Sequence, residues 1–367
     1  MIYHIYFGTS GNSGLYLDEI YQVLKREGYN QKVFVSYYYP FSYGEKIFFR
    51  RSDIEHSRYK GRYRKIVQGI ELISALVRIV FSTIKDKPDV INFSLGSGSY
   101  YVLVLFLQLI KKISGCKLII TCHDVCPFGH NVDANDSEIK NRKKIFTIAN
   151  FLLVHNKNSV IDLRQYFGVD ERKIVIHLFP IMNLSKLYTP SSKVKEKSID
   201  FLFIGGLRKE KGINFLLNTW KQFSVSHPQA SLCVAGIKGT CDDFDPESFS
   251  NNNVIFHLHY LSDQDYIDFV ASSKYVLLPY IRGTNSGIIS TVLSLGVKVI
   301  TSDIPMFKNN PLLSDDDMFE SESKASFMEI MDRKLKCNNE SKANLLNEYK
   351  ENFAKQVVAV YATVLKE

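Results

Sequence analysis

A chain of 367 residues is too long for one ordinary domain and fits two domains of about 150–200 residues each. Hydrophobic residues make up 45% of it, which is enough for two cores and excludes a disordered chain. The net charge of +8 suits an anionic partner. However, no zinc-finger spacing, RNP-like signature or helix-turn-helix pattern is present, so we expect no nucleic acid partner.

The chain opens with a pattern typical of a Rossmann-like domain. Residues 1–7 form an apolar strand that is too short for a signal peptide and lacks its basic leader. A glycine-rich loop ending at Gly14 follows, and residues 15–27 have the pattern of a helix. The glycines either let a ligand approach the backbone or simply form a tight turn.

Residues 46–65, which we call the basic segment, combine eight Lys or Arg residues with Phe and Tyr. Only Asp53 and Glu55 oppose them, and an amphipathic run, residues 66–84, follows directly. An anionic membrane surface attracts such a segment with about 1 kcal/mol per basic residue. The alternative is a solvated basic face on an ordinary helix.

Strands and helices then alternate along the whole chain. In the first half we predict strands at residues 3–7, 32–36, 90–93, 117–121, 151–154 and 174–176. In the second half we predict strands at residues 201–204, 231–235, 254–258, 275–278 and 298–301. The alternation predicts an α/β protein with doubly wound parallel sheets. Residues 100–110 are strongly apolar but too few to span a bilayer, which needs about 20, so we expect a buried helix there.

Histidine and cysteine residues raise a metal hypothesis in the first half. Cys122 and Cys126 flank His123 and Asp124, but the spacing is not the usual CxxC of a zinc site. The six cysteines are scattered, which favours reduced thiols in a cytosolic protein over a disulfide framework.

In the second half, residues 200–204 form an apolar strand that runs into Gly205, Gly206 and a basic loop. Arg208 and Lys211 lie in this loop, before a helix that begins near Gly212. Side chains at the carboxyl end of a parallel strand face the ligand crevice. Guanidinium and ammonium groups there neutralise a diphosphate, although a solvated basic turn is the simpler alternative.

A second strand–loop–helix unit follows at residues 274–300. Thr284, Asn285 and Ser286 are good N-cap types before a predicted helix at residues 287–295, which Gly296 ends. A helix start presents free backbone N–H groups and the positive end of the helix dipole. Both suit an anion such as phosphate.

The order GGLRKEKG, PYIRGTNSG and LGVKVITSD resembles the donor-binding half of retaining glycosyltransferases of family 4, which have the GT-B fold. The strand followed by Thr121-Cys122-His123-Asp124 resembles that family's strand-then-His-Asp loop, and residues 152–180 resemble the segment that closes its first domain. The resemblance runs from the first strand to about Asp303.

This resemblance implies two Rossmann-like domains that face a central cleft. Residues 1–186 are then the acceptor-side domain, completed by a C-terminal helix at about 350–367, and residues 198–349 are the donor domain after a linker at 187–197. The resemblance implies no cofactor and no essential metal. It gives His123 and Asp124 catalytic roles, and it implies donor binding by Gly14, Arg208, Lys211, Tyr280, Asn285, Ser286 and Gly287.

Two positions depart from the commonest pattern of the family. Gly283 and Thr291 stand where that pattern has two Glu residues, one for the donor sugar and one for the nucleotide ribose. Ser286 and Gly287 resemble a branch in which the first Glu is replaced. Without the second Glu, either the ribose is held otherwise or the protein is a weak or inactive relative.

The resemblance implies transfer of a hexose from a nucleotide diphosphate sugar to a glycan or lipid-linked acceptor, as in O-antigen or capsule assembly. We expect a cytoplasmic enzyme on the inner face of the cytoplasmic membrane, with an anionic membrane surface as a further partner. The alternative is a degenerate GT-B protein that binds a sugar nucleotide or a glycan partner without turnover.

Overall fold

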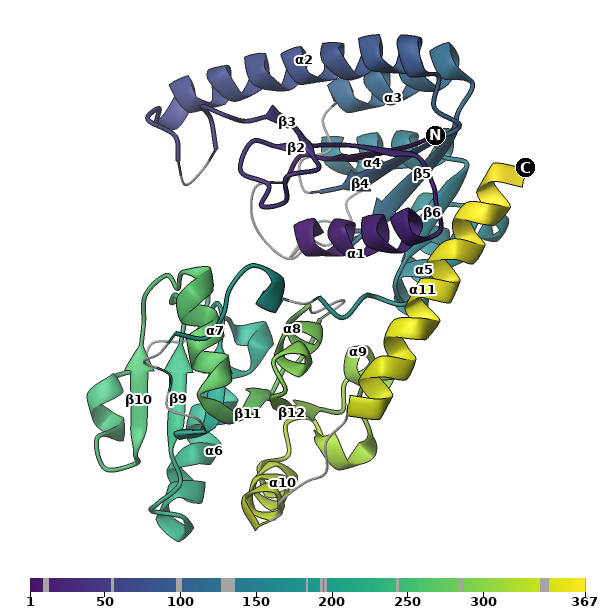
Figure 1. Ribbon diagram of the computed structural model, residues 1–367. Coiled ribbons are helices and arrows are strands. Elements are labelled where there is room, and N and C mark those ends of the chain that lie inside the picture. Colours follow the sequence, from purple (N-terminus) through teal and green to yellow (C-terminus); the bar gives the residue numbers. More distant parts are fainter. Residues whose placement is uncertain are drawn as a thin grey trace. The chain divides into compact units, whose positions relative to one another are not determined.

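The computed structural model describes residues 1–8, 13–53, 56–96, 101–126, 136–182, 184–191, 194, 197–241, 244–283, 287–336 and 343–366. The chain forms two compact units, each around its own sheet (Figure 1). The first comprises Met1–Pro180 and Lys350–Glu367, and the second comprises Ile181–Tyr349. The predicted fold class, two α/β domains with parallel sheets, is confirmed.

The sheet of the first unit has seven parallel strands in the order β3-β2-β1-β4-β5-β6-β7. Its strands are β1 Ile2–Tyr6, β2 Gln31–Ser36, β3 Glu45–Phe48, β4 Val90–Leu95, β5 Lys117–Cys122, β6 Phe151–Val154 and β7 Ile174–Ile176. Six of them match the predicted strands closely. β3 was not predicted, because this short edge strand is half exposed and overlaps the start of the basic segment.

The helices of the first unit are α1 Ser13–Arg26, α2 Gly61–Asp86, α3 Tyr101–Ser114, α4 Ser137–Ile148, α5 Lys157–Phe167 and the greater part of α11 Ala343–Lys366. Figure 1 shows α2 and α3 on one face of the sheet and α1 and α11 on the other. In α11, Phe353, Val357, Tyr361 and Val364 are buried at helical spacing. The Asn92 amide on β4 donates a hydrogen bond to the Tyr361 hydroxyl over 2.9 Å.

The helix predicted at residues 100–110 is present as α3, but it is buried on one side only. Helix α3 buries Leu103, Phe106 and Leu107. However, it leaves Tyr101 and Leu105 about half exposed, so only one side of this helix belongs to the core.

The second unit has six parallel strands in the order β10-β9-β8-β11-β12-β13. They are β8 Ile199–Ile204, β9 Leu232–Ala235, β10 Val254–His257, β11 Ser273–Leu278, β12 Lys298–Ser302 and β13 Met318–Phe319. Its helices are α6 Ile213–Ser226, α7 Asp263–Ala271, α8 Ile288–Ser294, α9 Pro305–Lys308 and α10 Lys324–Lys336. Trp220 of α6 and Phe327 of α10 are fully buried in the core of this unit.

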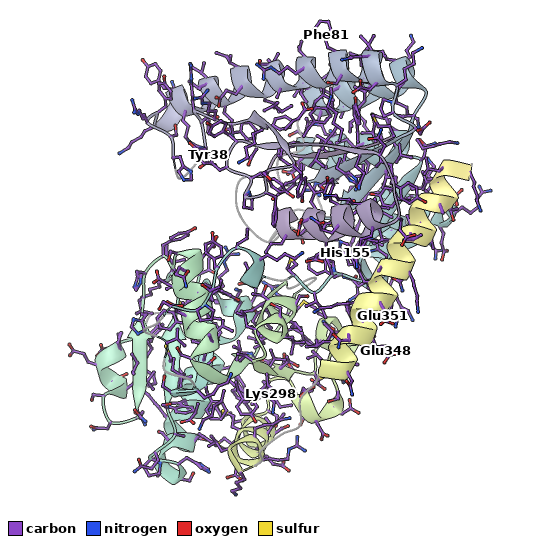
Figure 2. The ribbon with its side chains drawn as sticks, in the orientation of Figure 1. Tyr38, Phe81, His155, Lys298, Glu348 and Glu351 are labelled. Carbon is purple, nitrogen blue, oxygen red and sulfur yellow. The ribbon has the colours of Figure 1, made fainter. Side chains whose placement is uncertain are left out.

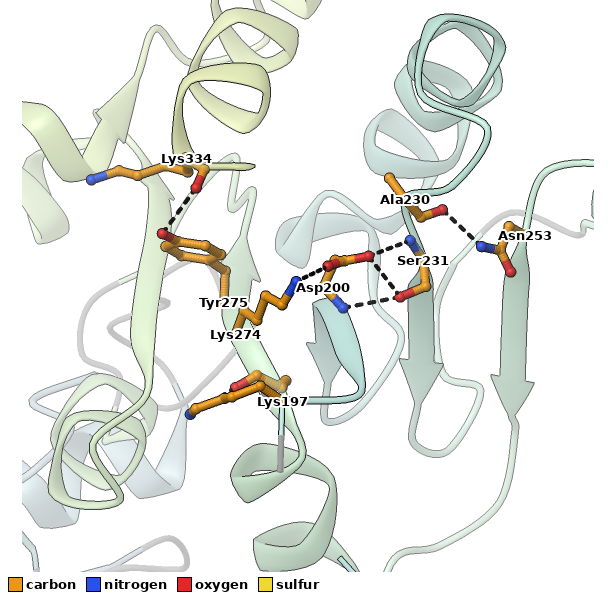
Figure 3. A network of polar contacts seen from close by, with 9 residues as sticks. Lys197, Asp200, Ala230, Ser231, Asn253, Lys274, Tyr275 and Lys334 are labelled. Atoms are coloured by element: carbon orange, nitrogen blue, oxygen red, sulfur yellow. Dashed lines mark hydrogen bonds and ion pairs between the residues drawn. The ribbon is translucent and has the colours of Figure 1, made fainter. Parts of the chain in front are cut away.

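A polar network at the amino ends of its strands fixes their alignment (Figure 3). The Asp200 carboxylate on β8 accepts hydrogen bonds from the backbone N–H and hydroxyl of Ser231, just before β9. It also pairs with the Lys274 ammonium on β11 over 2.7 Å. These contacts occupy the amino ends of the strands. A ligand is therefore expected at the carboxyl ends, as in other open α/β sheets.

The chain passes from the first unit to the second after Pro180, upstream of the predicted linker. The described part of residues 187–197 is bound to the second unit. The Tyr188 hydroxyl donates to Asp263, the Ser191 backbone N–H donates to Asp268, and the Lys197 ammonium donates to the Ser273 carbonyl. These hydrogen bonds make a polar, Pro- and Ser-containing segment part of a folded unit.

Candidate active site

The loops after β8 and β11 lie side by side at the carboxyl edge of the second sheet, because these strands are neighbours. The backbone N–H of Ile281 donates to the Glu210 carbonyl over 2.9 Å, and the Arg282 guanidinium contacts the Glu210 carboxylate at 3.3 Å. The loop that carries Arg208 and Lys211 is therefore joined to the loop that begins with Pro279.

Two glycines allow these loops to approach each other. A Cβ on Gly212 would lie 1.8 Å from the Pro279 carbonyl oxygen, and a Cβ on Gly236 would lie 2.0 Å from the Gly205 carbonyl oxygen. Both residues also have positive φ, +69° and +144°. Only glycine has no Cβ and also adopts a positive φ without strain. These two glycines therefore allow the backbones after β8, β9 and β11 to approach each other closely.

Lys211 is held at this junction with its charge partly removed from water. Its ammonium nitrogen lies 5.6 Å from the centre of the Tyr280 ring. Burial and, to a lesser degree, the neighbouring Arg208 lower the pKa of Lys211 to about 8. Arg208 itself is exposed. Two cations that repel each other in this way form a ready site for an anion that neutralises both.

The other predicted donor-binding residues of this unit have different surroundings. Tyr280 is only 6% exposed, packs against Phe307 and accepts a hydrogen bond from Ser302 at its backbone carbonyl. Gly287 is the N-cap of α8, so the helix starts within one residue of the prediction. Asn285 and Ser286, like Thr284, lie outside the described residues. Direct donor contacts by Tyr280, Asn285, Ser286 and Gly287 stay predictions.

Thr291 does not offer a polar group in place of the missing Glu. Its side chain is 1% exposed, and its hydroxyl donates to the Gly287 carbonyl one turn earlier in the same helix. A Cβ on Gly283 would lie 3.1 Å from the Met306 sulfur. Neither position supplies a carboxylate for a ribose or a sugar.

In the first unit, three histidines follow directly after three neighbouring strands. His123 comes after β5, His155 after β6 and His177 after β7. Their rings gather around Tyr16 of α1, with centroids 4.6 Å, 5.2 Å and 5.9 Å from the tyrosine ring. Phe179 completes the group, which we call the histidine cluster. The sequence suggested a role for His123 but did not predict this cluster.

The hydrogen bonds of His177 define its protonation. Its Nδ1 lies 2.8 Å from the Leu178 carbonyl, which can only accept, so Nδ1 carries the proton. Its Nε2 then accepts from the Tyr16 hydroxyl over 2.7 Å. Burial lowers the pKa of His123 and of His177 to about 4 and that of His155 well below its ordinary value. At neutral pH the cluster therefore holds uncharged imidazoles, which suit hydroxyl groups better than phosphates.

We expect acid to destabilise the first unit through this cluster. The imidazoles are neutral in the folded state and have a pKa near 6.5 when unfolded, so stability is complete above pH 6.5 and is lost as pH falls toward 4. Each histidine contributes a slope of up to about 1.4 kcal/mol per pH unit in this range. Urea unfolding followed by circular dichroism from pH 7 to 5 measures this slope, and His155→Leu should reduce it. An unchanged slope in the variant would disprove the assignment.

A residue that the sequence analysis missed positions the His123-Asp124 loop. Arg142 of α4 is 2% exposed and donates to the carbonyl oxygens of Asp124, over 2.7 Å, and Gly96. It also pairs with Glu138 one turn earlier, at 2.9 Å. Burial raises the pKa of Asp124, and Arg142 opposes that shift. The only signal in the sequence was the Glu138–Arg142 spacing of four, which is common on exposed helices.

Gly14 lies in the first turn of α1, where its carbonyl accepts a hydrogen bond from Tyr39. A Cβ there would lie 3.4 Å from the Tyr39 ring, an ordinary contact distance. The catalytic roles of His123 and Asp124 and donor binding by Gly14 stay predictions. Cys122 is buried, which raises the pKa of its thiol to about 12. Within the described ranges, no group of three His, Cys, Asp or Glu residues has a metal-binding arrangement.

Comparison with known proteins matches each part of the chain to a family. Residues 186–352 match the family described as "Glycosyl transferases group 1". Residues 58–179 match the "Glucosyltransferase 3-like, N-terminal domain". An "uncharacterized 41.2 kDa protein in cps region" of Klebsiella pneumoniae is 23% identical over 261 residues, which cover 67% of this chain and 69% of that protein.

Solved structures share the fold over the full length. One, described as "Trehalose-6-phosphate from E. coli bound with UDP-2-fluoro glucose", has a TM-score of 0.60 at 8% identity and covers 100% of this chain and 99% of its own. The lipopolysaccharide outer core galactosyltransferase WaaB has a TM-score of 0.57 at 13% identity, covering 98% and 99%. With the group 1 domain on its second unit and two parallel-sheet α/β units, the chain is a glycosyltransferase of the GT-B fold.

Proposed function

We propose that the protein is a retaining glycosyltransferase that moves a hexose from a nucleotide diphosphate sugar to a glycan or a lipid-linked saccharide. We place it in the cytoplasm, in surface polysaccharide biosynthesis such as O-antigen or capsule assembly. The observation that carries the proposal is the pair Arg208 and Lys211, held at the carboxyl edge of the second sheet inside the group 1 domain. The relative in a cps region of Klebsiella pneumoniae supports the pathway.

In the proposed reaction the acceptor hydroxyl attacks the anomeric carbon from the same face that the diphosphate leaves. The bond from that carbon to the phosphate oxygen breaks, the new glycosidic bond forms, and the hydroxyl proton passes to the departing diphosphate. Arg208 and Lys211 stabilise the charge that develops on the leaving group, which is the largest electrostatic demand of the step. The proposal therefore requires no essential metal and no cofactor.

The first test is a panel of UDP- and GDP-sugars, each incubated with the protein and read as released nucleotide. Turnover with at least one donor supports the proposal, and the configuration of the transferred sugar decides whether the anomeric centre is retained. Binding of a donor with no release, even with saccharide acceptors present, would contradict it.

That outcome would instead support a second candidate, a GT-B protein that binds a sugar nucleotide or a glycan without turnover. The observation in its favour is the buried Thr291, whose hydroxyl is bonded within its own helix. The ribose of a donor then has no carboxylate at this position, and binding elsewhere on the loop has to replace it.

We predict that His123→Ala lowers the turnover rate much more than it weakens donor affinity. The neutral His123 imidazole is proposed to orient the donor sugar in the reacting complex, so its contribution belongs to the transition state. One positioned catalytic side chain typically contributes at least about 10²-fold to the rate, so we expect kcat to fall by about 10²-fold. The matched control is His259→Ala, an exposed histidine of the second unit. Equal losses in kcat and donor affinity would contradict the orienting role.

A further inference from the structure

Helix α2 carries large apolar side chains that the first unit leaves uncovered. We call them the α2 stripe: Ile66, Ile70, Ile73, Val77, Phe81 and Ile84. Their exposed fractions run from 47% for Val77 to 68% for Phe81. They recur every three or four residues, so they share one face of the helix. Figure 2 shows Phe81 on the outer side of α2, directed away from the sheet.

The opposite face of α2 is part of the core. Leu72, Ala75, Leu76 and Ile79 are buried between the helix and the sheet. Among the described residues, α2 is the one helix long and apolar enough to cross a bilayer. However, a helix whose other face forms a protein core is not surrounded by lipid. The geometry suits a helix that lies along a surface.

Helix α3 extends the apolar surface. Tyr101, Leu105 and Leu109 are spaced four residues apart and are 54%, 48% and 46% exposed. Helix α3 packs directly against α2. Two neighbouring helices therefore present apolar side chains, and a surface of this kind marks an interaction site on a protein that is otherwise well packed.

The exposed charges along the α2 stripe are mainly positive. Arg62 and Lys65 precede it, Arg78 lies beside it, and Lys85 and Lys87 follow it, all exposed. The basic segment adds exposed Arg50, Arg51, Arg58 and Lys60 near the start of the helix.

The carboxylates of this region are bonded within the unit. Glu71 accepts hydrogen bonds from the backbone N–H groups of Arg51 and Ser52. Asp86 pairs with Lys32, and the buried Asp53 contacts His56. Asp53 is therefore buried and Asp86 is paired, whereas Glu71 stays partly exposed and the exposed Asp89 pairs with the N-terminal amine. The exposed charge beside the stripe is mainly positive.

We propose that the α2 stripe, with the exposed row of α3, docks face-on to a bilayer that contains anionic lipid. The apolar side chains enter the boundary between headgroups and acyl chains, and the flanking Lys and Arg side chains bind lipid phosphates. A second copy of this chain fits less well, because it would bring a further set of positive charges against the first. The inference rests on the surface of the first unit and is independent of the proposed catalysis.

The test is flotation with phosphatidylcholine vesicles that contain or lack phosphatidylglycerol. The wild-type protein should bind the anionic vesicles at least about tenfold better than the neutral ones, and added salt should weaken the binding. The variant Ile70→Ser/Val77→Ser/Phe81→Ser should lose at least tenfold in binding while melting like the wild type. The matched control, Val225→Ser/Ile237→Ser/Ile255→Ser, removes three apolar side chains of similar exposure from the second unit and should bind normally.

A fluorescence reporter gives a second measurement. The chain has a single tryptophan, Trp220, which is buried in the second unit, so Phe81→Trp adds one further tryptophan, on the stripe. Subtracting the wild-type spectrum leaves the emission of the new side chain. Its emission should shift to the blue with anionic vesicles. The proposal would be overturned by equal binding to neutral vesicles or by no binding to either kind. It would also be overturned if the stripe variant had a different oligomeric state from the wild type in lipid-free solution, because the stripe would then be a contact between copies of the chain. Nucleotide binding by the stripe variant, measured without lipid, separates this outcome from a failure of the proposed function.

Discussion

Arg208→Ala and Lys211→Ala should each weaken binding of the donor nucleotide by at least about tenfold. A hydrogen bond to a charged group contributes about 1.5–3 kcal/mol, and we propose that these two cations share one diphosphate. Calorimetric titration of UDP and GDP into each variant measures the loss. Lys209→Ala is the matched control, since it removes an exposed cation from the same turn, and it should change affinity little. Normal nucleotide affinity in the Arg208→Ala/Lys211→Ala double variant would refute the site.

The pH dependence of binding tests Lys211 separately. Its pKa is lowered to about 8, so the side chain is charged below pH 8 and neutral above it. Donor affinity should therefore fall about tenfold between pH 7 and pH 9. Lys211→Arg keeps its charge throughout this range, and its affinity should be nearly constant. A wild-type affinity that does not change over these two pH units would show that the Lys211 charge is not used.

Gly212→Ala should be among the most damaging single substitutions in the second unit. Gly212 and Gly296 have the same φ of +69°, which costs an alanine about 1–2 kcal/mol at either position. Only at Gly212 does the added Cβ meet an atom, the Pro279 carbonyl oxygen at 1.8 Å, while nothing lies within 4 Å of a Cβ at Gly296. Separating the two loops should add about 1–3 kcal/mol of destabilisation.

Urea unfolding followed by Trp220 fluorescence measures this difference, because the single tryptophan is buried in the second unit. Gly296→Ala controls for the backbone conformation alone. Gly212→Ala should also lower nucleotide affinity, since Arg208 and Lys211 lie in the loop that must move. Equal stability of the two variants would show that the approach of the loops does not matter.

The sequence predicted the architecture well because apolar strand and helix patterns alternate without interruption. β6, Phe151–Val154, and β7, Ile174–Ile176, have the bounds that the pattern indicated. Its failures have a common physical cause. β3 and β13 are short edge strands, and such strands bury too few residues to show an apolar run.

The candidate site was only partly visible in the sequence. Arg208 and Lys211 stood out because glycines and cations followed an apolar strand. The histidine cluster did not, because His123, His155 and His177 are far apart in the chain and meet only when β5, β6 and β7 align. Arg142 reads as one more cation of a basic helix, and only its burial shows that it holds the His123-Asp124 loop. Contacts between distant residues carry no local signal.

The α2 stripe illustrates the same limit. The sequence showed an amphipathic run after the basic segment, and the basic residues suggested a membrane. It did not show that the helix is apolar on both faces, with Leu76 and Ile79 in the core and Ile70 and Phe81 in solvent. Distinguishing the two faces required the packing of α2 on the sheet.

The central claim, that the donor diphosphate binds between the loops after β8 and β11, is tested most directly by a crystal structure with bound nucleotide. UDP or GDP, whichever binds more tightly in the titrations, should place its β-phosphate within hydrogen-bonding distance of the Arg208 guanidinium and the Lys211 ammonium. A nucleotide bound with its phosphates away from both side chains would contradict the account.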